Sequence, residues 1–350
     1  MIIVVQTAFL GDLILSVPAI RRIRQNFPDQ KIGVVCKKGL GNFLLHFNIC
    51  EQVYEIEKSN RSSYKTILET INEQNVSAVF CFHRSIRSQL LSFQIKASDK
   101  FGFASLLGRY IFDQTVPYPK AWPDVVRYMA IVSLIDQDVE EYFQKTDSKD
   151  LQALNFYDTN HRFNSIPEIF KFEEIKFRQK VQAQKVLIFP GSVWATKKWT
   201  QTGFINLVKL LKEKKCDVFL MGSPQEKHLC DEISRQAGHG TVKAGELSIE
   251  QSIEYISDAR FVVCNDSASA HMAAFVNRPA FVIFGPTTIN LGFRPWNDES
   301  RVIEYKLQCR PCGAHGHDQC PLKHHHCMEK INANDVWSMI TESGLLNNFS

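Results

Sequence analysis

Residues suited to binding an anion follow an apolar run in the second half of the chain. Phe261–Cys264 is followed by Asp266 and Ser267, and a segment of small residues at 268–275 comes next. Such a run is typical of a buried parallel strand, and Asp and Ser favour helix starts. A helix N-terminus at a strand's carboxyl end binds anions. We therefore predict a nucleotide diphosphate site here, with His271 near the start of the predicted helix, although an ordinary crossover with Asp266 as a helix cap fits equally well.

Three other predicted strands end in segments of similar character. They are Pro190–Trp199 (PGSVWATKKW), Gly222–Glu226 (GSPQE) and Gly285–Gly292 (GPTTINLG). A small-residue turn exposes backbone N–H groups to an anion, and Ser192 and Lys197 add a hydroxyl and a charge. Glu226 can accept from ribose hydroxyls. Simpler interpretations exist for the first two segments: a solvated lysine pair in Pro190–Trp199, and a first-turn glutamate facing the helix dipole in Gly222–Glu226. Four such strand ends together favour a binding edge.

One carboxylate in the first half suits general-base chemistry. Asp12 follows the β-branched run Ile2–Val5 and stands next to Gly11, which permits a close approach of the backbone to a ligand. At the carboxyl edge of a sheet, an aspartate can accept a proton from a bound substrate. The alternative is a capping role for the helix predicted over Leu13–Gln25.

Basic side chains in the first half suit an anionic substrate. Two of them follow the predicted strand Val76–Phe82, on the same edge as Asp12, and two lie at or in the helix predicted over Ser62–Gln74. Solvated surface residues are the alternative interpretation. The candidate contacts to such a substrate are Arg61, Lys65, Arg84 and Arg87.

A cysteine-rich segment lies near the end of the chain. Cys309–Cys327 reads CRPCGAHGHDQCPLKHHHC, so Cys309, Cys312, Cys320 and Cys327 are interleaved with histidines. Four thiolates suit tetrahedral zinc, and a four-cysteine site would be structural because no position stays open for a substrate. The gaps depart from the usual paired knuckles. Reduced cysteines that pack a loop, or disulfides formed on oxidation, remain alternatives.

Composition limits the class of protein. The 350 residues are 44% hydrophobic and 22% charged, which predicts buried cores and no extended disorder. The net charge of +4 is too small to indicate nucleic acid as a partner, but it suits anionic substrates or a membrane surface. No apolar run is long enough to span a membrane. Ten cysteines without a recognisable signal peptide predict a reducing cytoplasm.

Strands and helices alternate in both halves, which predicts parallel α/β sheets. We expect two doubly wound domains that face a central cleft, with a boundary in the charged segment 160–185. Residues 1–165 would form the first domain, and residues 180–335 the second, including the cysteine-rich loop 309–328. Residues 335–350 would form a C-terminal helix. No G-x-G-x-x-G or P-loop motif supports a dehydrogenase or a P-loop enzyme.

Together these stretches resemble the ADP-heptose:lipopolysaccharide heptosyltransferases, glycosyltransferase family 9. The motifs that carry the resemblance are QTAFLGDLILSVPAIRRIR, FPGSVWATKKW, MGSPQEK, DARFVVCNDSASAHMAAFVNRPAFVIFGPT and the CRPC…CPLKHHHCM tail. They occur in the family's order and spacing from residue 1 to about residue 340, and the tail is most similar to heptosyltransferases II.

The resemblance implies a GT-B fold of two Rossmann-like domains, with the acceptor domain at 1–165 and the nucleotide-sugar domain at 180–335. It also implies an inverting transfer that needs no catalytic metal. It implies that Asp12 is the catalytic base. The donor-binding residues that it implies are Ser192, Lys197, Glu226, Leu247, Asp266, Ser267, Ala268 and His271. Ala268 stands where the family's D-[ST]-G-x-x-H loop has glycine.

The resemblance also implies partners. These are an ADP-sugar donor, the lipopolysaccharide inner core as acceptor, and peripheral contact with the cytoplasmic face of the inner membrane. Two alternatives stay open from the sequence: a family member that uses another nucleotide sugar for a different surface glycan, and a non-catalytic protein that binds nucleotide sugars.

Overall fold

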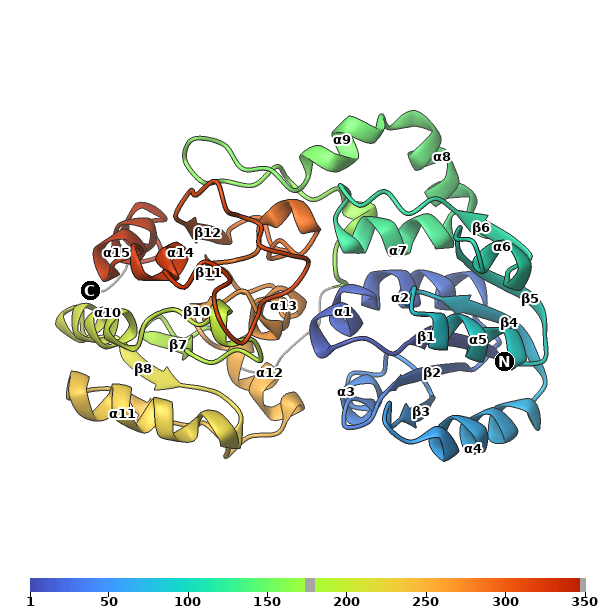
Figure 1. The fold of residues 1–350 in the computed structure, drawn as a ribbon, viewed down its shortest axis with the longest axis horizontal. Helices are drawn as coiled ribbons and strands as arrows, with labels where there is room; N and C mark the ends of the chain where they lie inside the picture. The colour runs from blue at the N-terminus through green and yellow to red at the C-terminus, as the bar shows by residue number, and fades with distance from the viewer. Residues whose placement is uncertain (174–179, 347–350) are drawn as a thin grey trace. The chain divides into compact units, whose positions relative to one another are not determined.

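The structure is a computed structural model that describes residues 1–173 and 180–346. Two compact units account for the described chain (Figure 1). Unit 1 comprises residues 1–153 and 167–171, and unit 2 comprises residues 154–166 and the chain from 172 onward. The charged segment expected at the domain boundary lies partly outside the described residues.

Unit 1 is built on six parallel strands in the order β3-β2-β1-β4-β5-β6. The strands are β1 (Ile2–Gln6), β2 (Ile32–Lys37), β3 (Gln52–Ile56), β4 (Val76–Cys81), β5 (Ala97–Phe103) and β6 (Gln114–Val116). The helices are α1 (Leu10–Leu15), α2 (Val17–Asn26), α3 (Gly41–His46), α4 (Arg61–Asn72), α5 (Ile86–Gln94), α6 (Gly108–Ile111), α7 (Asp124–Val132), α8 (Gln137–Lys145) and α9 (Ser148–Ala153), and a 3-10 turn, η1, spans Glu168–Phe170. One apolar cluster joins the strands to α4, α5 and α6 through residues such as Val79, Ile71 and Leu91.

Unit 2 repeats this plan with the strand order β12-β11-β10-β7-β8-β9. Its strands are β7 (Lys185–Phe189), β8 (Asp217–Leu220), β9 (Thr241–Val242), β10 (Phe261–Asn265), β11 (Ala280–Phe284) and β12 (Arg301–Glu304). Its helices are α10 (Gln201–Glu213), α11 (Lys227–Ala237), α12 (Ile249–Ser257), α13 (Ala268–Phe275), α14 (His326–Glu329) and α15 (Ala333–Glu342), and its 3-10 turns are η2 (Ala195–Lys197), η3 (Pro224–Glu226) and η4 (Ile289–Leu291). All pairings are parallel. The predicted fold of two doubly wound parallel sheets is therefore confirmed.

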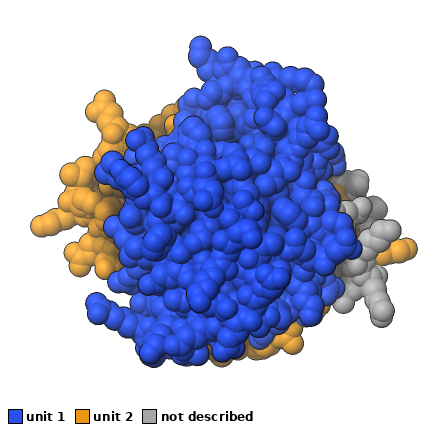
Figure 2. All heavy atoms as spheres, turned by 90° about the vertical axis from the view of Figure 1, so that its right-hand side faces the viewer, with its two compact units in different colours: residues 1–153, 167–171 blue, residues 154–166, 172–350 orange. Residues whose placement is uncertain are grey.

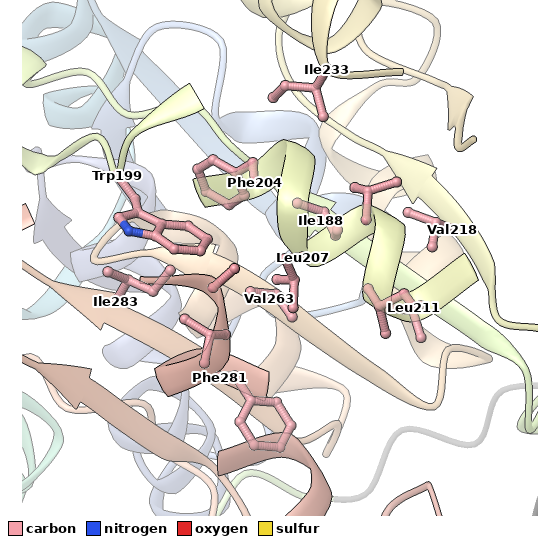
Figure 3. Close-up of a cluster of buried hydrophobic side chains, with 14 of the residues drawn as sticks. Ile188, Trp199, Phe204, Leu207, Leu211, Val218, Ile233, Val263, Phe281 and Ile283 are labelled. Carbon is pink, nitrogen blue, oxygen red and sulfur yellow. The ribbon is translucent and has the colours of Figure 1, made fainter. Parts of the chain in front are cut away.

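The core of unit 2 lies between its sheet and the helices α10, α11 and α15. Figure 3 shows Phe204, Leu207 and Leu211 of α10 among strand residues of this cluster. Trp199 is buried in the same cluster, and its indole N–H donates to the carbonyl of Ile331 at 2.8 Å. The core thereby holds the segment between β7 and α10, where two of the predicted donor residues lie.

Residues 154–166 belong to unit 2 although they precede residues 167–171 of unit 1. Arg294 is fully buried and donates to the carbonyls of Leu154 and Asn164. The hydroxyl of Tyr157 donates to the Glu304 carboxylate at 2.8 Å. These polar contacts fix the segment to unit 2.

Two helix predictions need correction. The single helix predicted over Leu13–Gln25 is two helices, α1 and α2. The helix is interrupted at Ser16, whose hydroxyl donates to the carbonyl of Leu13. Pro18 lies in the first turn of α2, where its missing N–H is not needed for a helical hydrogen bond. The C-terminal helix expected over 335–350 is α15, which ends at Glu342 and begins after Asn332, a cap whose side chain accepts from two backbone N–H groups. Within the described residues, no helix is both long and apolar enough to cross a membrane.

Candidate functional site

The four predicted anion-binding segments leave unit 2 from one edge of its sheet. They follow β11, β10, β7 and β8, which are consecutive neighbours in the strand order of this sheet. Because all four strands are parallel, their carboxyl ends lie side by side at that edge. We call the four loops, 190–200, 221–226, 265–268 and 285–288, the donor edge.

An ion pair with a shared hydroxyl occupies the middle of the donor edge. Lys197 Nζ donates to Asp266 Oδ2 at 2.6 Å, and the Thr287 hydroxyl donates to the same oxygen at 2.6 Å. The Lys197 and Asp266 side chains are only 13% and 7% exposed. The loops that carry Lys197 and Thr287 thus meet at one oxygen of the Asp266 carboxylate. The Lys197 ammonium is held in place there and remains partly accessible to solvent.

Asn265 connects two of these loops through its side-chain amide. Its Oδ1 accepts from the backbone N–H of Trp199 at 2.9 Å. Its Nδ2 donates to the carbonyls of Pro190 and Gly191 at 2.8 and 3.1 Å. The start of the 190–200 loop is therefore anchored to the end of β10, which limits how far Lys197 can move from Asp266.

The sequence left two roles open for Glu226, a helix cap and an acceptor for ribose hydroxyls, and its two carboxylate oxygens have different surroundings. Its Oε2 accepts from the N–H and the hydroxyl of Ser223 at 2.7 and 3.0 Å, which is a capping interaction. Its Oε1 lies against Gly191, where a Cβ atom would come within 1.6 Å of that oxygen. A side chain at position 191 would therefore displace the Glu226 carboxylate, one oxygen of which lies at the donor edge.

The first turn of α13 lies at the donor edge, because the helix begins directly after β10. Ser267 is the extended residue before the helix, and its hydroxyl bonds to that of Ser269 at 2.7 Å. Ala268 is the first helical residue and has no positive φ, so glycine is not needed there. The first N–H groups of an α-helix have no partner within the helix, and they favour an anion.

His271 lies one turn into α13 and is buried. Burial lowers the pKa of His271 to about 4, with nearby Asp266 opposing the shift and Lys197 adding to it. Its Nδ1 is a buried atom without a hydrogen-bond partner among the described residues. A neutral imidazole with an unpaired ring nitrogen, beside Lys197, is a group that a bound phosphate or ribose oxygen would satisfy.

In unit 1, Asp12 belongs to the first turn of α1. Its Oδ2 accepts from the backbone N–H of Phe9 at 3.2 Å, so the carboxylate does contribute a capping contact. The residue is half-buried, at the carboxyl end of β1. The capping contact uses one oxygen, and it is compatible with a second role for this carboxylate.

A cluster of ionisable groups lies near Asp12. Asp124 and Arg127 of α7 form a buried ion pair of 2.5 Å. Burial raises the pKa of Asp124 to about 7, opposed by Arg127 and reinforced by Asp12. The guanidinium groups of Arg84 and Arg127 lie 4.1 and 4.6 Å from the centre of the Tyr118 ring. Arg84 and Asp12 both act electrostatically on Tyr118, so Arg84 lies in the surroundings of Asp12.

The model of the family described as glycosyltransferase family 9 (heptosyltransferase) matches residues 65–326. The chain belongs to glycosyltransferase family 9.

Relatives within the family agree over nearly the whole chain. It is 23% identical over 347 residues to lipooligosaccharide heptosyltransferase 2 of Campylobacter jejuni, with 94% of this chain and 93% of the relative covered. The structure is similar to ADP-heptose LPS heptosyltransferase II of E. coli, with a TM-score of 0.73, 18% identity, and 99% and 98% of the chains covered. It is also similar to E. coli heptosyltransferase WaaC with ADP, with a TM-score of 0.70, 17% identity, and 98% and 99% covered. These likenesses confirm the expected GT-B fold.

The remaining predicted residues of this family 9 chain have less defined places. Ser192 is half-buried directly after Gly191. Leu247 is half-buried in the loop after β9, which lies beside the donor edge because the N–H of Gly245 donates to the carbonyl of Gly222 at 2.9 Å. Neither side chain has a contact that tests its expected role.

The other basic candidates of unit 1 differ in their surroundings. Arg87 donates to the carbonyl of Lys58 at 3.1 Å, and both it and Asp12 act electrostatically on Lys58. Arg61 begins α4, and Lys65 in the same helix pairs with Glu69 at 3.8 Å. The described contacts thus connect Arg84 and Arg87 to the surroundings of Asp12, and they do not do so for Arg61 and Lys65.

Two residues that hold loops of the donor edge in place were not predicted from the sequence. Arg310 donates to the carbonyls of Phe284, Gly285 and Thr287 and pairs with Glu304 at 2.8 Å. It thereby fixes the loop that carries the Thr287 hydroxyl. An arginine within C-R-P-C gives no sign of this, because the partners are carbonyl groups about 25 residues away.

Thr196 is the second of these residues. Its N–H donates to the carbonyl of His317 at 3.0 Å, and its hydroxyl lies 2.7 Å from the His317 N–H. The carbonyl of Thr196 accepts from His325 Nε2 at 2.7 Å, which assigns the proton to that nitrogen. The cysteine-rich segment therefore holds the residue next to Lys197, and it acts as a support for the donor edge.

The expected zinc site in that segment is not assembled. Within residues 1–173 and 180–346, no group of three or more His, Cys, Asp or Glu side chains is placed to hold a metal ion. The thiol of Cys312 donates to the carbonyl of Cys309 at 3.1 Å, and Cys327 is buried in the core of unit 2. None of the four thiols forms a disulfide, and they lie near enough to act electrostatically on one another.

His271 makes the stability of unit 2 sensitive to acid. Its pKa of about 4 in the folded protein lies below the unfolded value of about 6.5. The unfolded chain therefore binds the proton first, and stability falls as the pH drops from about 6.5 to about 4, by up to about 3 kcal/mol. We expect His271→Gln to flatten this pH dependence in urea unfolding, whereas the exposed His228→Gln should leave it unchanged. Parallel curves for wild type and His271→Gln would contradict the assignment.

Proposed function

We propose that this protein transfers heptose from ADP-heptose to the inner core of lipopolysaccharide. The observation that carries the proposal is the donor edge, where Lys197 and the Thr287 hydroxyl donate to one oxygen of Asp266, directly before the N-terminus of α13. These groups favour a diphosphate. The family membership and the heptosyltransferase names of the relatives support the choice of sugar and acceptor, and the structure of WaaC with ADP supports the choice of nucleotide.

The proposed chemistry uses side chains of both units. Asp12 takes a proton from an acceptor hydroxyl, whose oxygen then attacks the anomeric carbon of the donor. The bond from that carbon to the diphosphate oxygen breaks, and ADP leaves with the bonding electrons. Attack opposite the leaving group inverts the anomeric centre. Lys197 and the α13 N-terminus stabilise the charge that develops on ADP, and Glu226 accepts from the ribose.

The transfer is proposed to need no catalytic metal, since Lys197 and the helix N-terminus supply positive charge for the diphosphate. We expect the turnover rate in excess EDTA to stay within about twofold of the untreated rate. A loss of turnover without unfolding would contradict this part of the proposal.

A donor screen tests the function as a whole. Isothermal titration calorimetry would compare ADP-heptose with UDP- and GDP-sugars, followed by turnover assays with a delipidated inner-core acceptor. We expect selective binding of the ADP-sugar and release of ADP only with acceptor present. Preference for another nucleotide sugar would favour the alternative family 9 activity. Binding of ADP-heptose without turnover would favour the non-catalytic reading.

The acceptor side is tested through Arg84, which lies against Tyr118 near Asp12. Arg84→Glu places a negative charge where an anionic acceptor is proposed to bind, so the acceptor KM should rise about tenfold or more. Arg87→Glu should act in the same direction. ADP binding should be unchanged, and so should the acceptor KM of Lys31→Glu, whose exposed side chain precedes β2 at the opposite edge. Unchanged acceptor kinetics in both arginine variants would refute the assignment.

A further inference from the structure

Unit 1 carries an exposed apolar surface that the proposed chemistry does not use. Ile86, Leu90 and Phe93 of α5 are 67%, 45% and 56% exposed. Leu106, in the loop before α6, and Tyr110 of α6 are 90% and 85% exposed. We call these five side chains the α5–α6 surface. Figure 1 places α6 at the right-hand side of unit 1, and Figure 2 shows unit 1 from that side.

The α5–α6 surface is distinct from the face by which α5 packs on its sheet. Ile86, Leu90 and Phe93 recur at intervals of four and three residues, so they share one side of the helix. The buried Leu91 joins the cluster against the sheet, and the buried Ser88 lies beside it on α5. A helix with an apolar side beyond the one that packs on its own core indicates an additional binding partner.

Hydrogen bonds make this surface a fixed platform. Gln89 Nε2 donates to the carbonyl of Arg84 at 2.8 Å, and its Oε1 accepts from the Ser105 hydroxyl at 3.0 Å. The same hydroxyl oxygen accepts from the N–H of Gly108 at 2.7 Å, where α6 begins. The loop that carries Leu106 is thereby tied to α5, and the apolar side chains of both helices are presented together.

Basic residues outnumber acidic ones in and around α5 and α6, and one of them contacts the α5–α6 surface directly. The ammonium of Lys100 donates to the carbonyl of Phe93 at 2.7 Å and lies 5.5 Å from the centre of its ring. Residues 84–114 contain five basic side chains and two acidic ones. The basic ones are Arg84, Arg87, Lys96, Lys100 and Arg109, and the acidic ones are Asp99 and Asp113. One acid, Asp113, already accepts from the backbone N–H of Lys100.

We infer that the α5–α6 surface binds the surface of an anionic lipid bilayer. Exposed Leu, Ile and Phe enter the boundary between head groups and acyl chains, Tyr110 suits that boundary because its ring is apolar and its hydroxyl polar, and the basic neighbours meet anionic head groups. The biological purpose rests on the proposed function, since a lipopolysaccharide acceptor is anchored in a membrane. The binding itself follows from exposed apolar area and charge.

Vesicle binding by the full chain tests this inference. Co-sedimentation with vesicles of phosphatidylethanolamine and phosphatidylglycerol should exceed co-sedimentation with phosphatidylcholine alone, and added salt should weaken it. The double variant Leu106→Ser/Tyr110→Ser changes two side chains that hardly contact the protein, so folding should be unaffected. We expect the partitioning of this double variant onto vesicles to fall by about tenfold or more. Arg109→Glu should lower binding to the anionic vesicles only.

Leu45→Ser is the matched control, because Leu45 is an exposed leucine of α3 in the same unit. It should bind vesicles as the wild type does. Equal partitioning of the double variant and the wild type would overturn the inference. So would a double variant that lowers the mass measured by light scattering without changing vesicle binding, since the surface would then join copies of this chain. Turnover of a delipidated acceptor should be the same in the double variant and the wild type, so a failure of the proposed activity would be seen separately from a failure to bind lipid.

Discussion

Asp12→Asn should lower the rate of sugar transfer by about 10²–10⁴ while leaving ADP affinity within a few-fold of the wild type. The expected loss is that of removing a general base from the transfer. ADP binding should persist, because the donor edge belongs to unit 2 and Asp12 belongs to unit 1. Turnover would be measured as ADP release, and affinity by calorimetry.

The capping contact of Asp12 makes the choice of substitution important. Asparagine keeps an oxygen that can accept from the N–H of Phe9, so Asp12→Asn removes the base and retains the cap. Asp12→Ala removes both and should lower the unfolding free energy by about 1 kcal/mol as well. Asp113→Asn, at an exposed aspartate of the same unit, is the control for a simple change of charge.

Two outcomes would count against this role. Near-normal turnover in Asp12→Asn would mean that the carboxylate serves only as a cap. A loss of activity in Asp12→Ala alone, in proportion to its loss of stability, would lead to the same conclusion. The neighbouring Asp124, whose pKa is raised to about 7, would then be the next carboxylate to test.

The donor edge was predictable because its signals are local. Each apolar run that ends in small, hydroxyl or charged residues is visible in the sequence, and the rule for parallel sheets brings such ends to one edge. The structure adds the convergence of Lys197 and Thr287 on Asp266 Oδ2, since which oxygen they share depends on loop geometry.

The supports of that edge were not predictable, because their contacts join distant parts of the chain. Thr196 and His317 are 121 residues apart, and no pattern of residue types relates them. Asp124 and Arg127 form a buried pair three residues apart, but its position near Asp12 depends on how α7 packs. The break at Ser16 was missed because the apolar spacing continues through it, and Pro18 is tolerated as readily early in a helix as at a new start.

Lys197→Ala should weaken ADP and ADP-heptose binding together, by about tenfold or somewhat more. A charge-assisted contact to phosphate is worth about 1.5–3 kcal/mol. The neighbouring Lys198 provides the matched control. It is half-buried, and its backbone N–H donates to the carbonyl of Ala195. Among the described contacts, the ammonium that pairs with Asp266 is that of Lys197. Lys198→Ala should therefore change ADP affinity much less. Equal losses would mean that the lysine assignment is wrong.

The partner of Lys197 gives a second test that a loss of surface charge would not mimic. In the structure the ammonium pairs with Asp266 at 2.6 Å, so Lys197→Ala leaves a buried carboxylate facing the site of the diphosphate. Its negative charge would repel ADP and add to the loss of affinity. Asp266→Asn in the Lys197→Ala background removes that repulsion and keeps an oxygen for the Thr287 hydroxyl. The double variant should bind ADP more tightly than Lys197→Ala, and additive losses in the double-mutant cycle would show that the two side chains do not act on one phosphate.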